Sequence, residues 1–487
     1  MNFTDAIFLP VILLIAVLYY LVPLVVRPYL LLLWSLLFYC TWGPEKLPFI
    51  VGGAVIAWAA ALVISKKPKS RTGKAVMLIA VILLVGTLVF LKTARHLFEG
   101  DIIVPLGISY YTLALTGYVL DVYYGRIKAD KNYFQVLSFA AFFPGILQGP
   151  IARYKHLSPQ LREGHRFDYK KVCFGMQLAL YGFFKKLVIA DRLALYTNTV
   201  FSGDSFNKYS GSVILAGLLF RSIQLYCDFS GYMDIAAGIA QVFGVEITRN
   251  FNHPFFSRSA AEFWRRWHIS LGAWFKDFVY MPLMVSPAVM KTAQSVKKLF
   301  GKRAGKAVVT LIPVYCVWIL TGLWHGTSRN YVIWGIYWGT IIAFSTIYAQ
   351  DIRKVTKWLH INTGAESWKI FQMVRTFILF TIGRTITLDK PLQTVQRMVR
   401  EFNVSSWFDG TLYTIGMDRP NFILALLSIA FVWFISLQQE KYSVREKIAS
   451  FNIVFRWLIY YAAILAVVIF GMYGLNYDAS AFIYMQY

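Results

Sequence analysis

The chain has 487 residues, of which 57% are hydrophobic and only 15% are charged. This composition argues against an ordinary soluble enzyme and favours a protein that crosses a membrane several times. The formal net charge of +25 does not indicate nucleic acid as a partner, because the basic residues gather in short loops between apolar runs, as the positive-inside rule expects. The four cysteines form no Cys-x-x-Cys pair that would hold a metal or a redox disulfide.

Apolar runs follow one another along most of the chain, and they predict an all-α polytopic membrane protein with about 12 spanning helices. The candidate spans are residues 6–26, 29–42, 47–65, 75–94, 102–124, 172–190, 211–227, 307–325, 329–349, 370–388, 420–438 and 453–473. The first run lacks a basic start and a small-residue cleavage site, so we expect it to remain as a membrane helix.

Basic loops set the predicted topology. The loop at 66–74 is the most basic of the N-terminal half, which places it in the cytoplasm and the N-terminus outside. With that choice four later basic loops also lie inside, at 126–131, 297–306, 353–357 and 441–447. Residues 228–306 then begin and end on the inner side, and the sequence leaves open whether 230–247 and 278–290 cross as a pair or are re-entrant.

The segment 134–151 is apolar but interrupted by Pro-Gly and Gly-Pro. It predicts a re-entrant or half-buried helix. Broken helices at membrane depth are tolerated where protein or a water-filled cavity satisfies the freed backbone groups. We therefore expect this segment to line a cavity inside the bundle.

The stretch 262–282 sets charged residues, aromatic residues and His268 into the middle of a hydrophobic chain. At about 100° per residue, a helix would separate an aromatic half from a charged half, with His268 on the border. The aromatic half holds Phe263, Trp264, Trp267, Leu271, Trp274, Phe275 and Phe278, and the other half holds Glu262, Arg265, Arg266, Ala273, Lys276 and Asp277. The pattern predicts one amphipathic helix whose charged face meets water or a polar cavity.

A second histidine, His325, lies in the motif Leu-Trp-His-Gly at 323–326. It follows an apolar run of about nineteen residues that rises roughly 28 Å, which carries His325 toward the outer half of the membrane. His268 belongs to the inner-side region. Two histidines that approach a common interior from opposite faces suit a reaction that receives a group from the cytoplasm and delivers it outside.

Neutral imidazole can accept a hydroxyl proton while the hydroxyl attacks a carbonyl, since its unperturbed pKa is about 6.5. Arg265, Arg266, Trp324 and Arg329 are nearby donors for the developing oxyanion. Each histidine, taken alone, is more often explained as an interfacial residue. Asp228 is either a functional carboxylate at membrane depth, or a helix cap, or the ion-pair partner of an arginine.

Three absences narrow the chemistry further. The sequence contains no Gly-x-Ser-x-Gly elbow, no Walker A loop and no clustered His and Cys with metal-ligand spacing. We therefore expect no metal and no bound cofactor beyond an acyl donor.

Four motifs together resemble the membrane-bound O-acyltransferase family. They are the stretch 262–282, Leu-Trp-His-Gly at 323–326, Asp-Phe-Ser-Gly-Tyr-Met-Asp at 228–234 and Asn-Phe-Asn-His-Pro-Phe at 250–255. The resemblance is to the bacterial branch, which includes the membrane subunit of alginate O-acetylation and the D-alanyl transferase of lipoteichoic acid. It implies a ring-like catalytic core at 96–350 with an outer funnel and an inner pocket, flanked by transmembrane helices at 1–95 and 351–487.

The resemblance also implies roles for single residues. His325 would be the catalytic histidine and His268 the second histidine of the bacterial pattern. The candidate substrate-binding residues are Trp264, Arg265, Arg266, Asp228, Trp324 and Arg329.

The implied reaction moves an acetyl or similar short acyl group from a cytoplasmic thioester to a hydroxyl of an extracytoplasmic cell-surface polysaccharide. The donor would be acetyl-CoA or a phosphopantetheine-linked acyl carrier protein. The transfer would take place in a bacterial cytoplasmic membrane, directly or through a partner acyltransferase outside the cell. Two alternatives stay open: D-alanyl transfer to teichoic acid, and a non-catalytic transporter that only conducts the acyl group.

Overall fold

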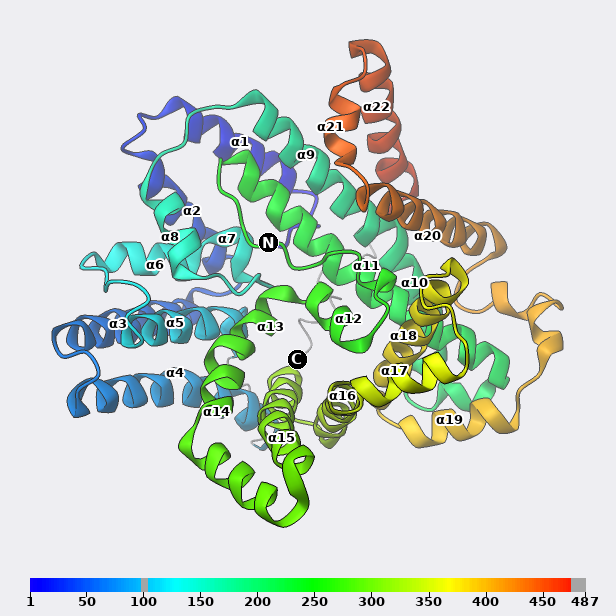
Figure 1. The fold of residues 1–487 in the computed structure, drawn as a ribbon. Coiled ribbons are helices and arrows are strands. Elements are labelled where there is room, and N and C mark those ends of the chain that lie inside the picture. Colours follow the sequence, from blue (N-terminus) through cyan, green and yellow to red (C-terminus); the bar gives the residue numbers. More distant parts are fainter. Residues whose placement is uncertain (98–103, 474–487) are drawn as a thin grey trace.

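The computed structural model describes residues 1–97 and 104–473, and Figure 1 gives their course. Regular structure in this part of the chain is helical, with one isolated bridge between Phe251 and Trp267 as the only strand-like pairing there. The prediction of an all-α fold is confirmed.

The helices of the first half are α1 (Phe8–Leu21), α2 (Arg27–Cys40), η1 (Pro44–Lys46), α3 (Leu47–Lys66), α4 (Arg71–Leu97), α5 (Ile108–Tyr123), α6 (Tyr133–Ala141), α7 (Phe143–Ile146), α8 (Tyr154–Arg162), α9 (Tyr169–Phe183), η2 (Phe184–Ala190), α10 (Asp191–Phe201), η3 (Ser205–Lys208) and α11 (Gly211–Val242). Those of the second half are η4 (Pro254–Phe256), α12 (Ala260–Arg266), α13 (Ile269–Phe275), η5 (Lys276–Tyr280), α14 (Met281–Met284), α15 (Pro287–His325), α16 (Arg329–Ile347), α17 (Ala349–Trp358), α18 (Glu366–Ile386), α19 (Pro391–Arg400), η6 (Val404–Trp407), η7 (Thr411–Tyr413), α20 (Arg419–Gln439), α21 (Val444–Ala449) and α22 (Ile453–Phe470). Two of the η segments, η2 and η5, are π-helical.

Among the described residues, 7 helices are long and apolar enough to cross a membrane, or up to 8 if the bent pair α16 and α17 forms one span. They are Pro44–Lys66, Arg71–Ala94, Tyr169–Phe201, Gly211–Val242, Pro287–His325, Arg419–Gln439 and Ile453–Phe470. The protein is therefore a polytopic membrane protein.

The prediction of about twelve spans was too high. Helices α1 and α2 have 14 residues each and α5 has 16, so each is shorter than the roughly 30 Å hydrocarbon core of a bilayer. Helix α18 is long enough, but it carries Lys369, Arg375 and Arg384. The start of the predicted span 102–124 lies outside the described residues.

The region after residue 227 also differs from the prediction. Helix α11 does not end at 227 but continues for 32 residues to Val242, so Asp228 lies within a helix and 230–247 is not a separate crossing. The segment 278–290 is divided among η5, α14 and the start of α15. These two segments therefore do not form the crossing pair that the sequence left open.

Helices α9 and α11 pack side by side (Figure 1) because glycines remove side chains from their contact. A Cβ atom on Gly175 would meet the carbonyl oxygen of Gly238 at 2.5 Å, and one on Gly182 would meet that of Gly231 at 2.5 Å. Such close approach is typical of helices that associate in membranes through small residues. It fixes the position of α11, whose residue Phe229 contacts the site described below.

The segment 134–151 is broken and buried, as predicted. Helix α6 ends at Ala141 and the short α7 starts at Phe143, and most residues of both helices are buried. The predicted single helix over 262–282, in contrast, is wrong. It is divided into α12, α13, η5 and α14, with a left-handed backbone conformation at His268.

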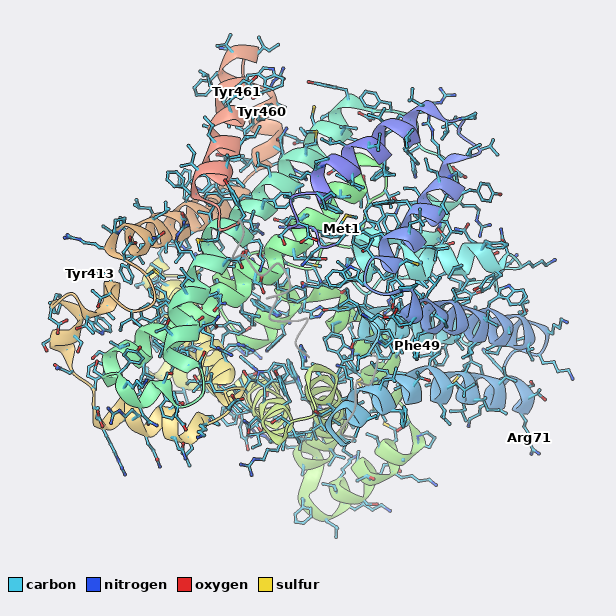
Figure 2. The ribbon with its side chains drawn as sticks, turned by 180° about the vertical axis from the view of Figure 1, so that it is seen from behind. Met1, Phe49, Arg71, Tyr413, Tyr460 and Tyr461 are labelled. Atoms are coloured by element: carbon cyan, nitrogen blue, oxygen red, sulfur yellow. The ribbon has the colours of Figure 1, made fainter. Side chains whose placement is uncertain are left out.

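Helices surround α12 and α13, which lie near the middle of the view in Figure 1. At the periphery, no residue of α22 is buried, and Figure 2 shows Tyr460 and Tyr461 on this helix, which projects at the edge of the molecule. Exposed apolar side chains on such a helix are expected where lipid is the solvent. Functional side chains are therefore to be sought at the centre.

Candidate active site

The turn that carries His268 is held by the neighbouring loop. His268 has φ 47° and ψ 51°, a left-handed conformation that costs a non-glycine residue on the order of 1–3 kcal/mol. The carbonyl of Asn250 accepts a hydrogen bond from the Ile269 N–H at 3.0 Å. The Oδ1 atom of Asn250 accepts from the Ser270 N–H at 3.0 Å and from the Ser270 hydroxyl at 2.9 Å. These bonds replace those of a continuous helix, which explains the break.

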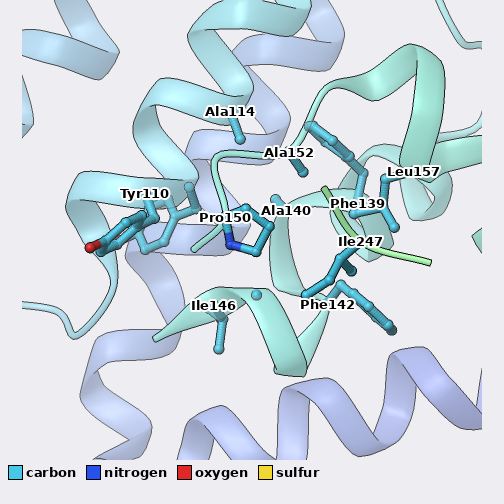
Figure 3. Close-up of a pocket in the computed structure, with 12 residues that line it drawn as sticks. Tyr110, Ala114, Phe139, Ala140, Phe142, Ile146, Pro150, Ala152, Leu157 and Ile247 are labelled. Carbon is cyan, nitrogen blue, oxygen red and sulfur yellow. The ribbon is translucent and has the colours of Figure 1, made fainter. Parts of the chain in front are cut away.

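The same turn is tied to two further segments. The Ile151 N–H donates to Ser270 Oγ at 3.0 Å, and the Asn250 amide lies 3.3 Å from the sulfur of Met233 on α11. Figure 3 shows Tyr110 beside Pro150, where both residues line a cavity of about 20 Å³, which is room for about one water molecule. His268 therefore rests on a rigid, well-packed support.

Three aromatic rings enclose the buried His268 ring. Phe229 and Trp324 meet it edge-on, with 4.9 Å and 5.8 Å between ring centroids, and Tyr110 stacks on it at 6.5 Å. Neither ring nitrogen of His268 has a hydrogen-bond partner among the described residues. A buried polar group left in this state costs about 1–3 kcal/mol. The His268 nitrogens are therefore suited to bind a ligand that enters the site.

Burial also sets the charge of His268. It lowers the pKa of the imidazole well below its usual range, and the neighbouring His325 acts in the same direction. The imidazole is therefore neutral near pH 7, as a hydrogen-bonding or base-catalytic role requires.

His325 is the last residue of α15 and is half-buried. Its Nδ1–H donates to the carbonyl of Thr321 at 2.7 Å, so the lone pair of this tautomer is on Nε2. The His325 and His268 ring centroids lie 6.5 Å apart. The structure thus brings together the two histidines that the sequence singled out, and their catalytic roles remain predictions.

Trp324 lies at the centre of this cluster. Its ring meets His325 at 4.9 Å and Tyr110 at 5.6 Å, in addition to His268. Its indole N–H points to the carbonyl of Ser109 at 3.4 Å, and its own carbonyl accepts a hydrogen bond from the ammonium of Lys92 at 2.6 Å. Trp324 thus contacts both histidine rings, and its role in binding substrate remains a prediction.

Trp264 is one ring further away from His325 than Trp334 is. It packs against Trp318 at 4.9 Å, Trp338 at 5.0 Å and Trp334 at 5.6 Å. Trp334 in turn meets His325 at 5.2 Å. Trp264 therefore supports the wall of tryptophans behind His325.

The structure does not show the three predicted arginines in contact with either histidine. Arg266 forms ion pairs with Glu440 at 2.7 Å and with Glu262 at 3.0 Å. Arg265 and Arg329 are exposed and have no ion pair or hydrogen bond among the described residues. A role of Arg265 or Arg329 in binding substrate would therefore be at the surface.

Asp228 takes part in a buried ion pair. Its carboxylate lies 2.8 Å from the ammonium of Lys186, which also lies 2.7 Å from Asp191. The ion-pair interpretation is therefore supported, with a lysine as the partner. The residue that follows, Phe229, is the one that packs on His268, so the ion pair anchors the helix behind the site.

A cavity of about 470 Å³ lies beside the end of α15. Its lining includes Lys92, Arg221, Gly326, Thr327, Tyr331 and Lys390. Gly326 and Thr327 directly follow His325, so the cavity reaches the histidine end of the helix. Its lining mixes polar with apolar residues, and its charged residues are three cations and one carboxylate, Asp389.

Sequence reasoning missed Lys92 and Ser270 as parts of this site. Lys92 had a usable signal, because a lysine near the end of a hydrophobic helix merits a functional hypothesis. Ser270 had none, since its role depends on a backbone turn that a helical pattern conceals.

Comparisons with known proteins show the family to which this chain is related. Residues 126–380 match the membrane-bound O-acyltransferase (MBOAT) family. The probable alginate O-acetylase AlgI of Pseudomonas syringae pv. tomato is 30% identical over 449 residues, which cover 88% of this chain and 80% of that protein. The peptidoglycan O-acetyltransferase of Helicobacter pylori is 28% identical over 362 residues, 66% of this chain and 65% of that protein. The teichoic acid D-alanyltransferase of Bacillus subtilis is 29% identical over 288 residues, 59% of this chain and 69% of that protein.

The fold is that of a multi-pass membrane protein, and the paired histidines form a buried candidate site at the centre of its helices. The extent of the matches then establishes the family of the chain. The chain belongs to the membrane-bound O-acyltransferase family and is a transferase.

Proposed function

We propose that the protein transfers an acetyl or similar short acyl group from a cytoplasmic thioester to a hydroxyl of an extracytoplasmic cell-surface polysaccharide. The acyl group reaches the sugar directly or through a partner acyltransferase. The observation that carries this proposal is the meeting of His268 and His325, whose ring centroids lie 6.5 Å apart at the centre of the helices.

His325 acts in this proposal as general base or as transient acyl acceptor. As a base, its Nε2 takes the proton of the acceptor hydroxyl while the hydroxyl oxygen forms a bond to the thioester carbonyl carbon. The carbon–sulfur bond then breaks, and the proton passes to the departing thiolate. The hydrogen bond from Nδ1–H to Thr321 supports this role because it holds the required tautomer.

His268 is placed on the donor side. Its two ring nitrogens have no partner among the described residues, and a neutral imidazole can orient the thioester by hydrogen bonding. Acetyl-CoA or an acyl carrier protein would approach from the predicted inner side, where the basic loops attract phosphate. We therefore place the protein in a bacterial cytoplasmic membrane with its N-terminus outside, so that the donor approaches from the cytoplasm.

The acceptor would enter through the cavity beside Gly326 and Thr327. Its volume of about 470 Å³ is within the range of pockets that hold small ligands. We assign this cavity as the expected outer funnel. It lies apart from the side of the site on which His268 would bind the donor, and this separation supports a path in which donor and acceptor enter from different sides.

The relatives leave two alternatives in view. The similarity to a teichoic acid D-alanyltransferase favours D-alanyl transfer as the second candidate. A non-catalytic acyl-group transporter is the third, and it would need a path through the site but no base at His325.

Mass analysis of cell-surface polysaccharides from cells with and without the intact gene tests the proposal. Acetyl esters differ from D-alanyl esters in mass and in amine content. Loss of acetyl esters in the deletion strain is expected. Loss of D-alanyl esters would replace the proposal by the second candidate, and an unchanged ester content would overturn both.

A further inference from the structure

One cation near the site is explained neither by the fold nor by the family motifs. Lys92 lies on α4, in the span Arg71–Ala94, whose apolar window has a mean hydropathy of 2.7. The 21 residues from Arg71 to Lys92 rise roughly 31 Å, so Lys92 is near the end of α4 that lies opposite the basic loop at 66–74. A lysine there could extend its side chain to lipid headgroups.

The side chain of Lys92 does not do so. It turns to the protein interior, where its ammonium donates to the Trp324 carbonyl at 2.6 Å and lies 5.7 Å from the centre of the Trp324 ring. The last carbonyls of a helix have no partner within that helix, and the negative end of the helix dipole favours a cation. Lys92 therefore caps the end of α15 that carries His325.

Two other bonds close the same turn. The Thr321 carbonyl accepts from His325 Nδ1, and the Gly322 carbonyl accepts from the Gly326 N–H at 3.1 Å. Of the three donors to the carbonyls of this turn, only Lys92 comes from another helix. It thus fixes where the end of α15, and with it the His325 ring, lies relative to α4.

Lys92 also lines the cavity of about 470 Å³ beside Gly326 and Thr327. An ammonium has three N–H donors, and the Trp324 carbonyl is the single hydrogen-bond acceptor recorded for Lys92 among the described residues. The remaining donors are available to an acceptor molecule in this cavity.

We propose that Lys92 is a positioning residue of the acyl transfer, which fixes the Trp324–His325 end of α15 and holds the acceptor beside His325 through its remaining N–H donors. This inference rests on the proposed function and adds a residue that neither motif contains.

The test compares Lys92→Met, which keeps the length of the side chain, with Lys92→Arg, which keeps the cation. Lys369→Met is the matched control, because Lys369 lies on α18 outside the lining of this cavity and is paired with Glu366 at 2.6 Å. Each variant is reconstituted in proteoliposomes, and thiol release from acetyl-CoA is followed with de-esterified cell-surface polysaccharide as acceptor. The amount of inserted protein is measured in each sample.

We expect Lys92→Met to lower kcat about tenfold to a hundredfold and to raise KM for the polysaccharide but not for acetyl-CoA. Lys92→Arg should recover a large part of kcat, and Lys369→Met should leave kcat unchanged. A wild-type kcat for well-inserted Lys92→Met would overturn the proposal, as would equal losses in Lys92→Met and Lys369→Met.

A second measurement does not depend on activity. In a cryo-electron microscopy structure of Lys92→Met, the last turn of α15 and the His325 ring should be displaced from their wild-type positions. An unchanged His325 would overturn the positioning role. If the wild-type protein releases no thiol while the variant shows the displacement, direct transfer from acetyl-CoA to the polysaccharide fails and the role of Lys92 in fixing α15 stands.

Discussion

The imidazole rings of His268 and His325 lie 6.5 Å apart, centroid to centroid, with their planes at 86°. His325 ends α15, which is interrupted at Gly301 by a non-helical backbone conformation (φ 84°, ψ 175°), whereas His268 occupies a left-handed turn between two helices of 7 residues each. The part of α15 after its kink and a short, broken helix thus bring the two rings to one place. The predictions below test how each ring is held there and what each does.

Asn250 should be needed to place His268. Asn250→Ala removes the acceptor of the Ser270 N–H and hydroxyl, so the turn at His268 loses its support. We expect a loss of about a hundredfold in the rate of acyl transfer, since a misplacement of about 1 Å has that effect. Asn250→Asp keeps the acceptor oxygen and should retain more activity. Equal rates for Asn250→Ala and the wild type, at equal membrane levels, would contradict this account of the turn.

The neutral state of His268 should make stability depend on pH. Its pKa in the folded protein is below the unfolded value of about 6.5. The stability that comes from burying the neutral ring is therefore complete above about pH 6.5 and is lost as the pH falls below it, because the unfolded chain then binds a proton that the folded chain does not. Thermal unfolding in detergent should show a lower Tm at about pH 5 than at about pH 8. His268→Phe should reduce this dependence, and an identical dependence in both proteins would refute the assignment.

The buried ion pair of Lys186 and Asp228 should contribute to stability. Lys186→Met removes the cation from between two carboxylates, those of Asp228 and Asp191, and breaking a buried pair in this way costs about 3–5 kcal/mol. Lys369→Met, which breaks an exposed pair with Glu366, should cost at most about 1 kcal/mol. Unfolding midpoints of the two variants in the same detergent measure the difference. Equal midpoints would argue against an anchoring role for the pair behind Phe229.

Arg265 should affect the binding of the donor more than the chemical step. It is exposed, without an ion pair or hydrogen bond among the described residues, so it is available to the phosphates of coenzyme A. We expect Arg265→Ala to raise KM for acetyl-CoA several-fold with kcat unchanged, the behaviour of a residue that binds ground state and transition state equally. Arg266→Ala is the control, since Arg266 is already paired with Glu440 and Glu262. A fall in kcat alone for Arg265→Ala would instead place this arginine at the reacting atoms.

The fold class and the two histidines were predictable from sequence because their signals are local. Apolar runs predict helices, and the motifs around His268 and His325 are short. The number of spans was not predictable, because an apolar run of 14 residues such as α1 can form a helix without crossing a bilayer of about 30 Å.

The break at His268 was not predictable for a different reason. The pattern of residues 262–282 predicts one helix. The hydrogen bonds that break this helix come from Asn250, which lies outside the stretch. The cap that Lys92 places on α15 likewise joins two distant parts of the chain, with a separation of 232 between Lys92 and Trp324. Such long-range hydrogen bonds leave no periodic trace in the sequence.

The central claim is that His325 performs the acyl transfer, and one measurement tests it most directly. Cells that carry His325→Ala at the chromosomal locus are compared with wild-type and deletion cells for the ester content of their surface polysaccharide by mass spectrometry, with membrane abundance and unfolding midpoint of the variant checked in parallel. The account predicts a folded, inserted variant whose ester content equals that of the deletion strain. A wild-type ester content in the His325→Ala cells would contradict it and favour a transporter.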